Sequence, residues 1–232
     1  MEKFVTDIYS QHLAGRDYID IGPLYGLVNE TLSVAAQYRP KSLAAADIDP
    51  LSSPSWTALK DRLASKNIDN YKAFSVNLDD PKIHEILGDY DFVYSAGILY
   101  HVPSPHFTLM QYRKIARKYF VLGSMIMPER IENERGKLEF GGGQMLFVPA
   151  LGESERQICA AYFDSMNLQI QHINADQSWP WRNRNGPNYG PWWWLYSATT
   201  CRRMLETAGW RVLADEATWA GRHHYFFCER IE

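Results

Sequence analysis

The chain has 232 residues, of which 46% are apolar and 22% charged, and its net charge is −3. This length fits one large domain or one domain with a sizeable insertion, and the composition is that of an ordinary globular protein. The slight acidity provides no electrostatic footprint for nucleic acid, and no apolar run reaches the roughly 20 residues that span a bilayer. Because the N-terminus also lacks an apolar signal region, we expect a cytoplasmic protein.

Strands alternate with helices through the first half of the chain. The predicted strands cover residues 18–21, 42–48, 71–76, 90–95 and 118–124. The predicted helices cover residues 1–16, 27–38, 55–66, 81–87 and 105–116. This alternation predicts an α/β fold with a doubly wound, mostly parallel sheet between two layers of helices.

The alternation breaks at residues 128–191, which are polar and glycine-rich and contain one predicted helix over residues 153–166. Regularity returns with a helix over residues 199–208, followed by strands over residues 210–214 and 224–229. These two strands predict an antiparallel hairpin that completes a seven-stranded sheet. Because strands resume after it, we interpret 128–191 as an insertion in a single domain spanning residues 1–232.

The three cysteines are far apart and lack CxxC spacing: Cys159, Cys201 and Cys228. We expect them to be reduced, partly buried small hydrophobes rather than a disulfide framework. No cluster of histidines and acids has the spacing of metal ligands, so the sequence predicts no metal site.

The chain is organised around the stretch from Tyr18 to Gly26. An apolar strand that carries an acid runs into a turn with two glycines, in the pattern Asp20-x-Gly22-x-x-x-Gly26. Strand, glycine turn and helix is how α/β folds build a nucleotide site, because glycines allow close backbone approach and a helix N-terminus offers N–H groups. Leu24 stands where the middle glycine of the dinucleotide fingerprint would be. A tight turn without a ligand is the alternative interpretation.

Polar side chains follow the next two strands. A carboxylate at the end of the second strand can accept hydrogen bonds from both ribose hydroxyls, and Asp49 is the predicted residue, with Asp47 as second choice. The alternative for Asp49 is a helix cap or a solvated carboxylate. After the third strand, Asn77 is predicted to read an adenine edge and Leu78 to pack on the ring. A turn residue that caps the next helix is the alternative for Asn77.

The fourth strand and the segment after it read DFVYSAGILYHVPSP, from Asp91 to Pro105. Here the chain resembles the class I S-adenosylmethionine-dependent methyltransferases, in which such a glycine loop, strand-two acid and strand-four segment occur in this order. The resemblance covers residues 18–124, and residues 192–210 are similar to the family's closing half. The sequence around Tyr100-His101 is most similar to that of a branch of the family that includes tRNA wobble-uridine carboxymethyl transferases. The basic RNA-binding extension of that branch is not evident here.

The resemblance implies a Rossmann-like sheet with an antiparallel strand near its end, and S-adenosylmethionine as the cofactor. It implies that the cofactor-binding residues come from the glycine loop and the adjacent strand ends: Asp20, Gly22, Pro23, Leu24, Gly26, Asp49, Asn77, Leu78, Ser95, Ala96 and Gly97. The last three would line the floor beside the methyl group. Leu24 departs from the family's usual glycine, and a side chain there would narrow the site.

Methyl transfer from a sulfonium is an in-line displacement that needs alignment and, for a hydroxyl acceptor, a base. His101 lies just past the fourth strand, where ligands sit in such sheets, and it is the predicted base. The alternative is a histidine that only holds the loop. Tyr100 is predicted to contact the sulfonium or the acceptor, and a purely structural aromatic is its alternative.

The insertion is expected to form the acceptor pocket or its lid. Aromatic faces bind sugar or planar rings, and polar side chains fix hydroxyls or carboxylates. The predicted substrate-binding residues are Trp179, Trp181, Arg182, Trp193 and His224. Tryptophans that merely anchor the insertion on the sheet are the alternative.

Together these features predict a methyltransferase that acts on oxygen or nitrogen of a small polar metabolite, such as a sugar or a natural-product intermediate. One alternative is a non-catalytic partner subunit that binds the same cofactor. The other is a tRNA-modifying transferase, although the charge gives no sign of a nucleic-acid partner.

Overall fold

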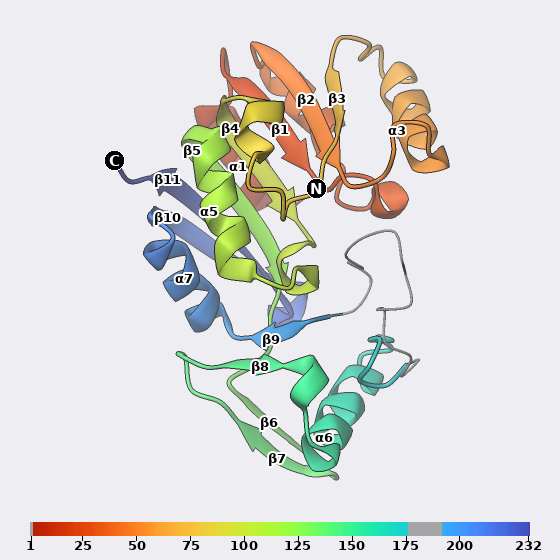
Figure 1. Ribbon diagram of the computed structural model, residues 1–232, viewed down its shortest axis with the longest axis vertical. Helices are drawn as coiled ribbons and strands as arrows, with labels where there is room; N and C mark the ends of the chain where they lie inside the picture. The colour runs from red at the N-terminus through yellow and green to blue at the C-terminus, as the bar shows by residue number, and fades with distance from the viewer. Residues whose placement is uncertain (1, 176–191) are drawn as a thin grey trace.

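Seven strands form the central sheet, in the order β10-β11-β5-β4-β1-β2-β3 (Figure 1). The computed structural model describes residues 2–175 and 192–232. The strands are β1 (Asp17–Ile21), β2 (Ser42–Asp47), β3 (Lys72–Ser75), β4 (Tyr90–Ala96), β5 (Ala116–Met125), β10 (Trp210–Thr218) and β11 (His223–Arg230). Strands β1 to β5 pair in parallel, and β11 is antiparallel to both β5 and β10. The predicted sheet, with its terminal hairpin, is therefore confirmed.

The strand order reverses at β1, which pairs with β2 on one side and with β4 on the other. In open α/β sheets, ligands bind outside the carboxyl ends of the strands at such a switch point. The carboxyl ends of β1, β2 and β4 carry the glycine loop, Asp47 and Gly97, which the sequence singled out.

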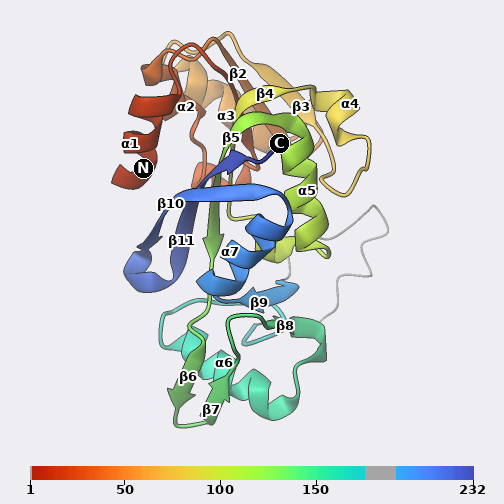
Figure 2. The same cartoon turned by 90° about the vertical axis from the view of Figure 1, so that its left-hand side faces the viewer.

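Helices cover both faces of the sheet (Figure 2). One face packs under α1 (Lys3–His12), α2 (Leu32–Ala35) and α3 (Pro54–Ala64); the other packs under α4 (Ile83–Leu87), α5 (Pro105–Ile115) and α7 (Ala198–Thr207). Strand β4 shows the consequence of this sandwich, because Phe92 and Tyr94 enter one core while Val93 enters the other. A strand buried on both faces reads as a continuous apolar run, which is why it was recognisable in the sequence.

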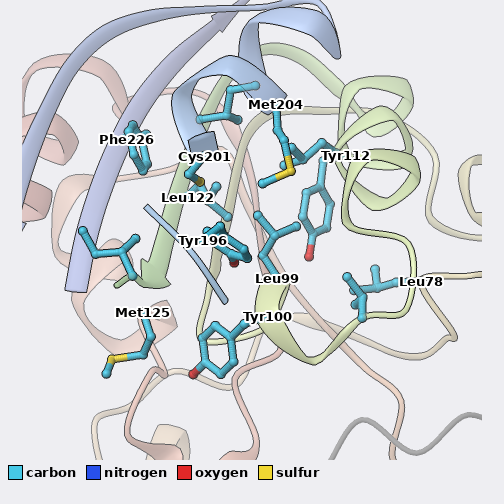
Figure 3. Packing of buried hydrophobic residues seen from close by; sticks show 14 of the residues in the cluster. Leu78, Leu99, Tyr100, Tyr112, Leu122, Met125, Tyr196, Cys201, Met204 and Phe226 are labelled. Carbon is cyan, nitrogen blue, oxygen red and sulfur yellow. The ribbon is translucent and has the colours of Figure 1, made fainter. Parts of the chain in front are cut away.

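The segment after β5 forms two small sheets and one helix below the main sheet (Figures 1 and 2). Hairpin β6 (Arg130–Asn133) and β7 (Gly136–Glu139) is followed by β8 (Met145–Phe147), which pairs with β9 (Trp194–Tyr196), and by α6 (Glu153–Asp164). Helix α6 was predicted, but the four short strands were not. Buried residues of α6 belong to the same apolar cluster as α5 and α7, part of which Figure 3 shows around Tyr112 and Tyr196.

The helix predicted over residues 27–38 is wrong. Only α2 is α-helical there, and it lies between two 3₁₀ turns, η1 (Tyr25–Leu27) and η2 (Ala36–Tyr38). The carboxylate of Asp20 accepts hydrogen bonds from the backbone N–H and the hydroxyl of Thr31, at 2.7 and 2.8 Å. These bonds tie the residue before α2 to β1 instead of to a preceding helical turn, so the helix starts only at Leu32.

The three cysteines are free, and they are fully buried where partial burial was expected. The helices within residues 2–175 and 192–232 include none that is long and apolar enough to cross a bilayer. The cytoplasmic location stays a prediction.

Candidate active site

The glycine loop is shaped by the segment that follows β4. Gly22 has φ +87°, and a Cβ on it would lie 2.0 Å from Cδ1 of Ile98. Its N–H donates to the carbonyl of Ala46 at 2.8 Å, which holds the loop against the end of β2. Gly26 also has a positive φ, +56°, inside η1. Position 22 therefore requires glycine for two reasons, its backbone conformation and the close approach of Ile98.

The side chain of Leu24 does not extend into solvent. Its side chain is 5% exposed and belongs to the core beneath α2 and α3, while Pro23 beside it is also buried. The backbone N–H of Leu24 donates to the carboxylate of Asp47 at 3.2 Å. The leucine side chain, which replaces the usual glycine, therefore packs in the core, and the backbone of the loop remains next to β2.

Asp47 and Asp49 have different surroundings. Asp47 ends β2, and its carboxylate accepts the Leu24 N–H on one oxygen and the N–H of Ile48, at 2.7 Å, on the other. Burial raises the pKa of Asp47. Asp49 lies two residues further on, where its backbone carbonyl accepts from the indole of Trp56 at 2.9 Å. Of the two acids, Asp47 is the one in contact with the glycine loop.

Asp20 and Ser95 lie inside the protein. Asp20 is 1% exposed, its carboxylate is bound to Thr31, and burial raises its pKa. Ser95 is fully buried, and its hydroxyl hydrogen-bonds that of Tyr112 at 2.9 Å. Both side chains therefore support the site from within.

The segment after β3 contributes a turn and an apolar side chain. The carboxamide oxygen of Asn77 accepts the N–H of Asp79 at 2.9 Å, which is the turn that the sequence offered as the alternative. Leu78 is 7% exposed and packs in the same core as Ile21 of β1. Both residues follow β3, which is the neighbour of β2 in the sheet.

A residue that the sequence did not single out, Asn29, lies over the end of β4. Its side-chain amide donates to the carbonyl of Ala96 at 3.3 Å. A Cβ on Gly97, whose φ is +77°, would lie 2.4 Å from the Asn29 amide nitrogen. The floor formed by Ala96 and Gly97 is therefore covered on one side by Asn29. Nothing in the sequence links positions 29 and 97, which lie far apart in the chain.

Tyr100 and His101 form η3 (Leu99–His101) and pack against the chain that returns from the insertion. The ring of Tyr100 lies 4.3 Å from that of Trp192, and His101 lies edge-on to Trp192 at 6.2 Å, centre to centre. Tyr100 stands at the margin of the apolar cluster in Figure 3, and burial raises its pKa. Its phenol is therefore held neutral, while His101 remains partly exposed.

Trp193 and Trp194, which follow the insertion, hydrogen-bond to η3 and to the residues just after it. The backbone N–H of Trp193 donates to the carbonyl of Tyr100 at 2.9 Å, and the indole of Trp194 donates to the carbonyl of Pro103 at 3.0 Å. Trp193 is 8% exposed and stacks on Phe147. The other predicted substrate-binding residues of the insertion, Trp179, Trp181 and Arg182, lie outside the described residues.

The side chain of His224 contacts other residues of the sheet. Its Nε2 lies 2.7 Å from the carboxylate of Asp215 on β10, and its ring stacks on Phe226. Asp215 also pairs with Arg202 of α7. In the part of the chain that the structure describes, no group of three or more histidines, cysteines and acids is arranged to hold a metal ion.

No protein-family model matches the sequence, and no curated protein does either. Solved structures do match. Magnesium protoporphyrin IX methyltransferase from Synechocystis, solved with S-adenosylhomocysteine, has a TM-score of 0.56 at 13% identity, over 98% of this chain and 80% of that one. An O-methyltransferase family protein from Burkholderia thailandensis has a TM-score of 0.59 at 15% identity, over 99% of this chain and 56% of that one.

A third match is 1,6-didemethyltoxoflavin-N1-methyltransferase from Burkholderia thailandensis, also solved with S-adenosylhomocysteine. Its TM-score is 0.56 at 12% identity, over 99% of this chain and 78% of that one. At identities this low, the matches establish the architecture alone. The strand order of the sheet agrees with that architecture. The chain has the fold of the class I S-adenosylmethionine-dependent methyltransferases.

Proposed function

We propose that the protein is an S-adenosylmethionine-dependent methyltransferase that acts on oxygen or nitrogen of a small polar metabolite, such as a sugar or a natural-product intermediate. The observation that carries this proposal is the contact between Asp47 and Leu24. It brings a carboxylate and the glycine loop together at the switch point of the sheet. That is where a doubly wound sheet binds a nucleoside.

The residues present fit such a cofactor. Each oxygen of a carboxylate can accept two hydrogen bonds. Oδ1 of Asp47 accepts from the N–H groups of Ile48 and Asp49, and Oδ2 accepts from that of Leu24, so Oδ2 retains one acceptor position for a ribose hydroxyl. Ile48, beside it, is 39% exposed and offers an apolar surface for a base. We therefore propose Asp47 for the ribose, in place of Asp49. Gly26 is exposed, and an added Cβ there would meet no atom within 3.4 Å, so its backbone is one that a ligand can approach closely.

When bound, S-adenosylmethionine supplies an activated methyl group. The chain has to align an acceptor with it and to accept the acceptor's proton. We propose His101 for the proton, because it is partly exposed and lies just past the carboxyl end of β4. Tyr100 stays neutral and positions His101 through ring contact, at 4.3 Å between centres. Residues 128–191, including Trp179, Trp181 and Arg182, are proposed to line or cover the acceptor.

Titration calorimetry with S-adenosylmethionine and S-adenosylhomocysteine tests the proposal. Both are expected to bind with a stoichiometry of one per chain, and an unrelated nucleoside such as uridine should not. Absence of heat with both cofactor forms would defeat the proposal.

One observation favours a second candidate, a non-catalytic partner subunit that binds the cofactor. The ring of His101 packs against Tyr100 and edge-on against Trp192, as expected of a histidine that only holds the loop. Binding of both cofactor forms without any methyl transfer to a panel of hydroxyl and amine acceptors would favour this candidate.

A further inference from the structure

His223 lies at the carboxyl edge of the parallel strands although it is far from the loop motifs in sequence. It opens β11, and the antiparallel register places it opposite Met125, the last residue of β5. Its side chain is 4% exposed. The edge that carries the glycine loop therefore also carries this histidine, on the face covered by α1, where its neighbour Tyr225 packs.

The imidazole lies beside the proposed cofactor floor. Ala96 and Gly123 are register partners, and the N–H of Gly97 donates to the carbonyl of Gly123 at 3.0 Å. A Cβ on Gly123 would lie 2.8 Å from Cβ of Ala96 and 3.0 Å from Cε1 of His223. The ring and the Ala96 methyl thus share one small space, which exists because residue 123 has no side chain.

Hydrogen bonds define which nitrogen of His223 is available. Nδ1 lies 3.1 Å from the hydroxyl of Thr218, and that hydroxyl also makes a long bond of 3.5 Å to the His223 carbonyl. A hydroxyl that donates to the carbonyl accepts from Nδ1–H, which leaves the lone pair on Nε2. Within residues 2–175 and 192–232, Nε2 has no hydrogen-bond partner, and it is not among the buried polar atoms sealed from solvent.

Aromatic rings flank the imidazole. Trp219 lies 5.1 Å from it, centre to centre, and Tyr225 lies 4.5 Å from it edge-on. Trp219 is nevertheless 51% exposed, in the turn between β10 and β11. Burial, and then the neighbouring His224, lower the pKa of His223 to about 4, so the ring is neutral at pH 7. A neutral nitrogen that can accept a hydrogen bond, next to an exposed indole, suits a ligand ring that carries a hydroxyl or N–H group.

We propose that His223 and Trp219 form an acceptor-binding corner, in which Nε2 accepts a hydrogen bond from a hydroxyl or N–H of the methyl acceptor and Trp219 contacts the ring that bears it. This inference rests on the proposed methyltransferase function. In this proposal His223 orients the methyl acceptor, and His101 removes the acceptor's proton. It also commits the acceptor to a class, a hydroxylated or amino-substituted ring.

The test uses the full-length protein and phenol as the probe, with imidazole nitrogens observed by long-range proton–nitrogen NMR at pH 7. The His223 signals are assigned by their loss in His223→Gln. We expect Nε2 to be unprotonated, and phenol to shift both Nε2 and the Trp219 indole. Toluene, which lacks the hydroxyl, should shift Trp219 alone. His84, an exposed histidine paired with Asp89, is the internal control and should not respond.

Thr218 variants show whether the hydrogen bond directs the tautomer. Thr218→Ser should keep the phenol response of Nε2, whereas Thr218→Val should reduce it several-fold because Nδ1–H loses its acceptor. A protonated Nε2 in the wild type, or no His223 response to phenol, would overturn the inference. Calorimetry with S-adenosylhomocysteine on the same samples separates the two proposals. Cofactor binding without the phenol response defeats this corner alone, and a phenol response without cofactor binding defeats the methyltransferase function alone.

Discussion

The carboxylate of Asp47 accepts a hydrogen bond from the backbone N–H of Leu24 at 3.2 Å, and this bond joins the end of β2 to the loop after β1. The contact has two consequences. It fixes which acid faces the switch point of the sheet, and it directs the side chain of Leu24 into the core beneath α2 and α3. A leucine in place of the usual glycine is therefore compatible with cofactor binding at the switch point.

Replacing Gly22 tests the close packing of the loop. Gly22→Ala is expected to lower the free energy of unfolding by about 2–4 kcal/mol, because strain at positive φ adds to the clash with Ile98. Gly15→Ala is the matched control, since Gly15 has φ +71° but no atom within 4 Å of an added Cβ. It should lose only about 1 kcal/mol in urea unfolding. Equal losses for the two variants would show that Ile98 does not constrain the loop.

His101→Ala tests the proposed base. With an acceptor found by screening, turnover should fall about 10²–10⁴-fold while the affinity for S-adenosylhomocysteine is kept. The control is His84→Ala, in which an exposed histidine on α4 is removed and turnover should be unchanged. A fall of less than threefold in His101→Ala would leave this residue only its packing against Tyr100 and Trp192.

The buried His223 predicts an acid-sensitive stability. Its pKa is lowered to about 4 in the folded protein, by burial first and by His224 second, against about 6.5 when unfolded. The unfolded chain therefore binds an extra proton between these values, and the fold loses stability as the pH falls from 6.5 towards 4. From pH 7 to pH 5 this group should account for about 1–2 kcal/mol of lost unfolding free energy.

His223→Gln should remove that share of the pH dependence, although it can lower stability at pH 7. Urea unfolding at pH 7 and pH 5 gives the comparison. If wild type and variant lose the same free energy between the two pH values, His223 is not the group that titrates.

The sequence predicted the sheet because its strands are short apolar runs separated by glycine, proline and acidic turns, as at Tyr90–Ala96. It failed where tertiary bonds override local preference. The helix over residues 27–38 is shortened by Asp20, whose partner Thr31 is eleven residues away. Strands β8 and β9 are three residues each and pair across about fifty residues of chain, so no local pattern reveals them.

The candidate site was predictable only in part. Glycines and acids at strand ends mark the switch point, but sequence spacing does not show which of Asp47 and Asp49 contacts the loop. Contacts between distant segments are equally hidden: Asn29 lies over Gly97, and His223 lies beside Gly123. These residues meet because the sheet places the ends of β4, β5 and β11 side by side.

The affinity of S-adenosylhomocysteine for Asp47→Ala and Asp49→Ala, measured by calorimetry, tests the central claim most directly. Loss of the ribose hydrogen bond in Asp47→Ala should weaken binding by about 1–3 kcal/mol, which is roughly 5- to 150-fold in Kd, while Asp49→Ala should bind like the wild type. Unchanged affinity in Asp47→Ala, or a loss confined to Asp49→Ala, would contradict the proposed placement of the cofactor.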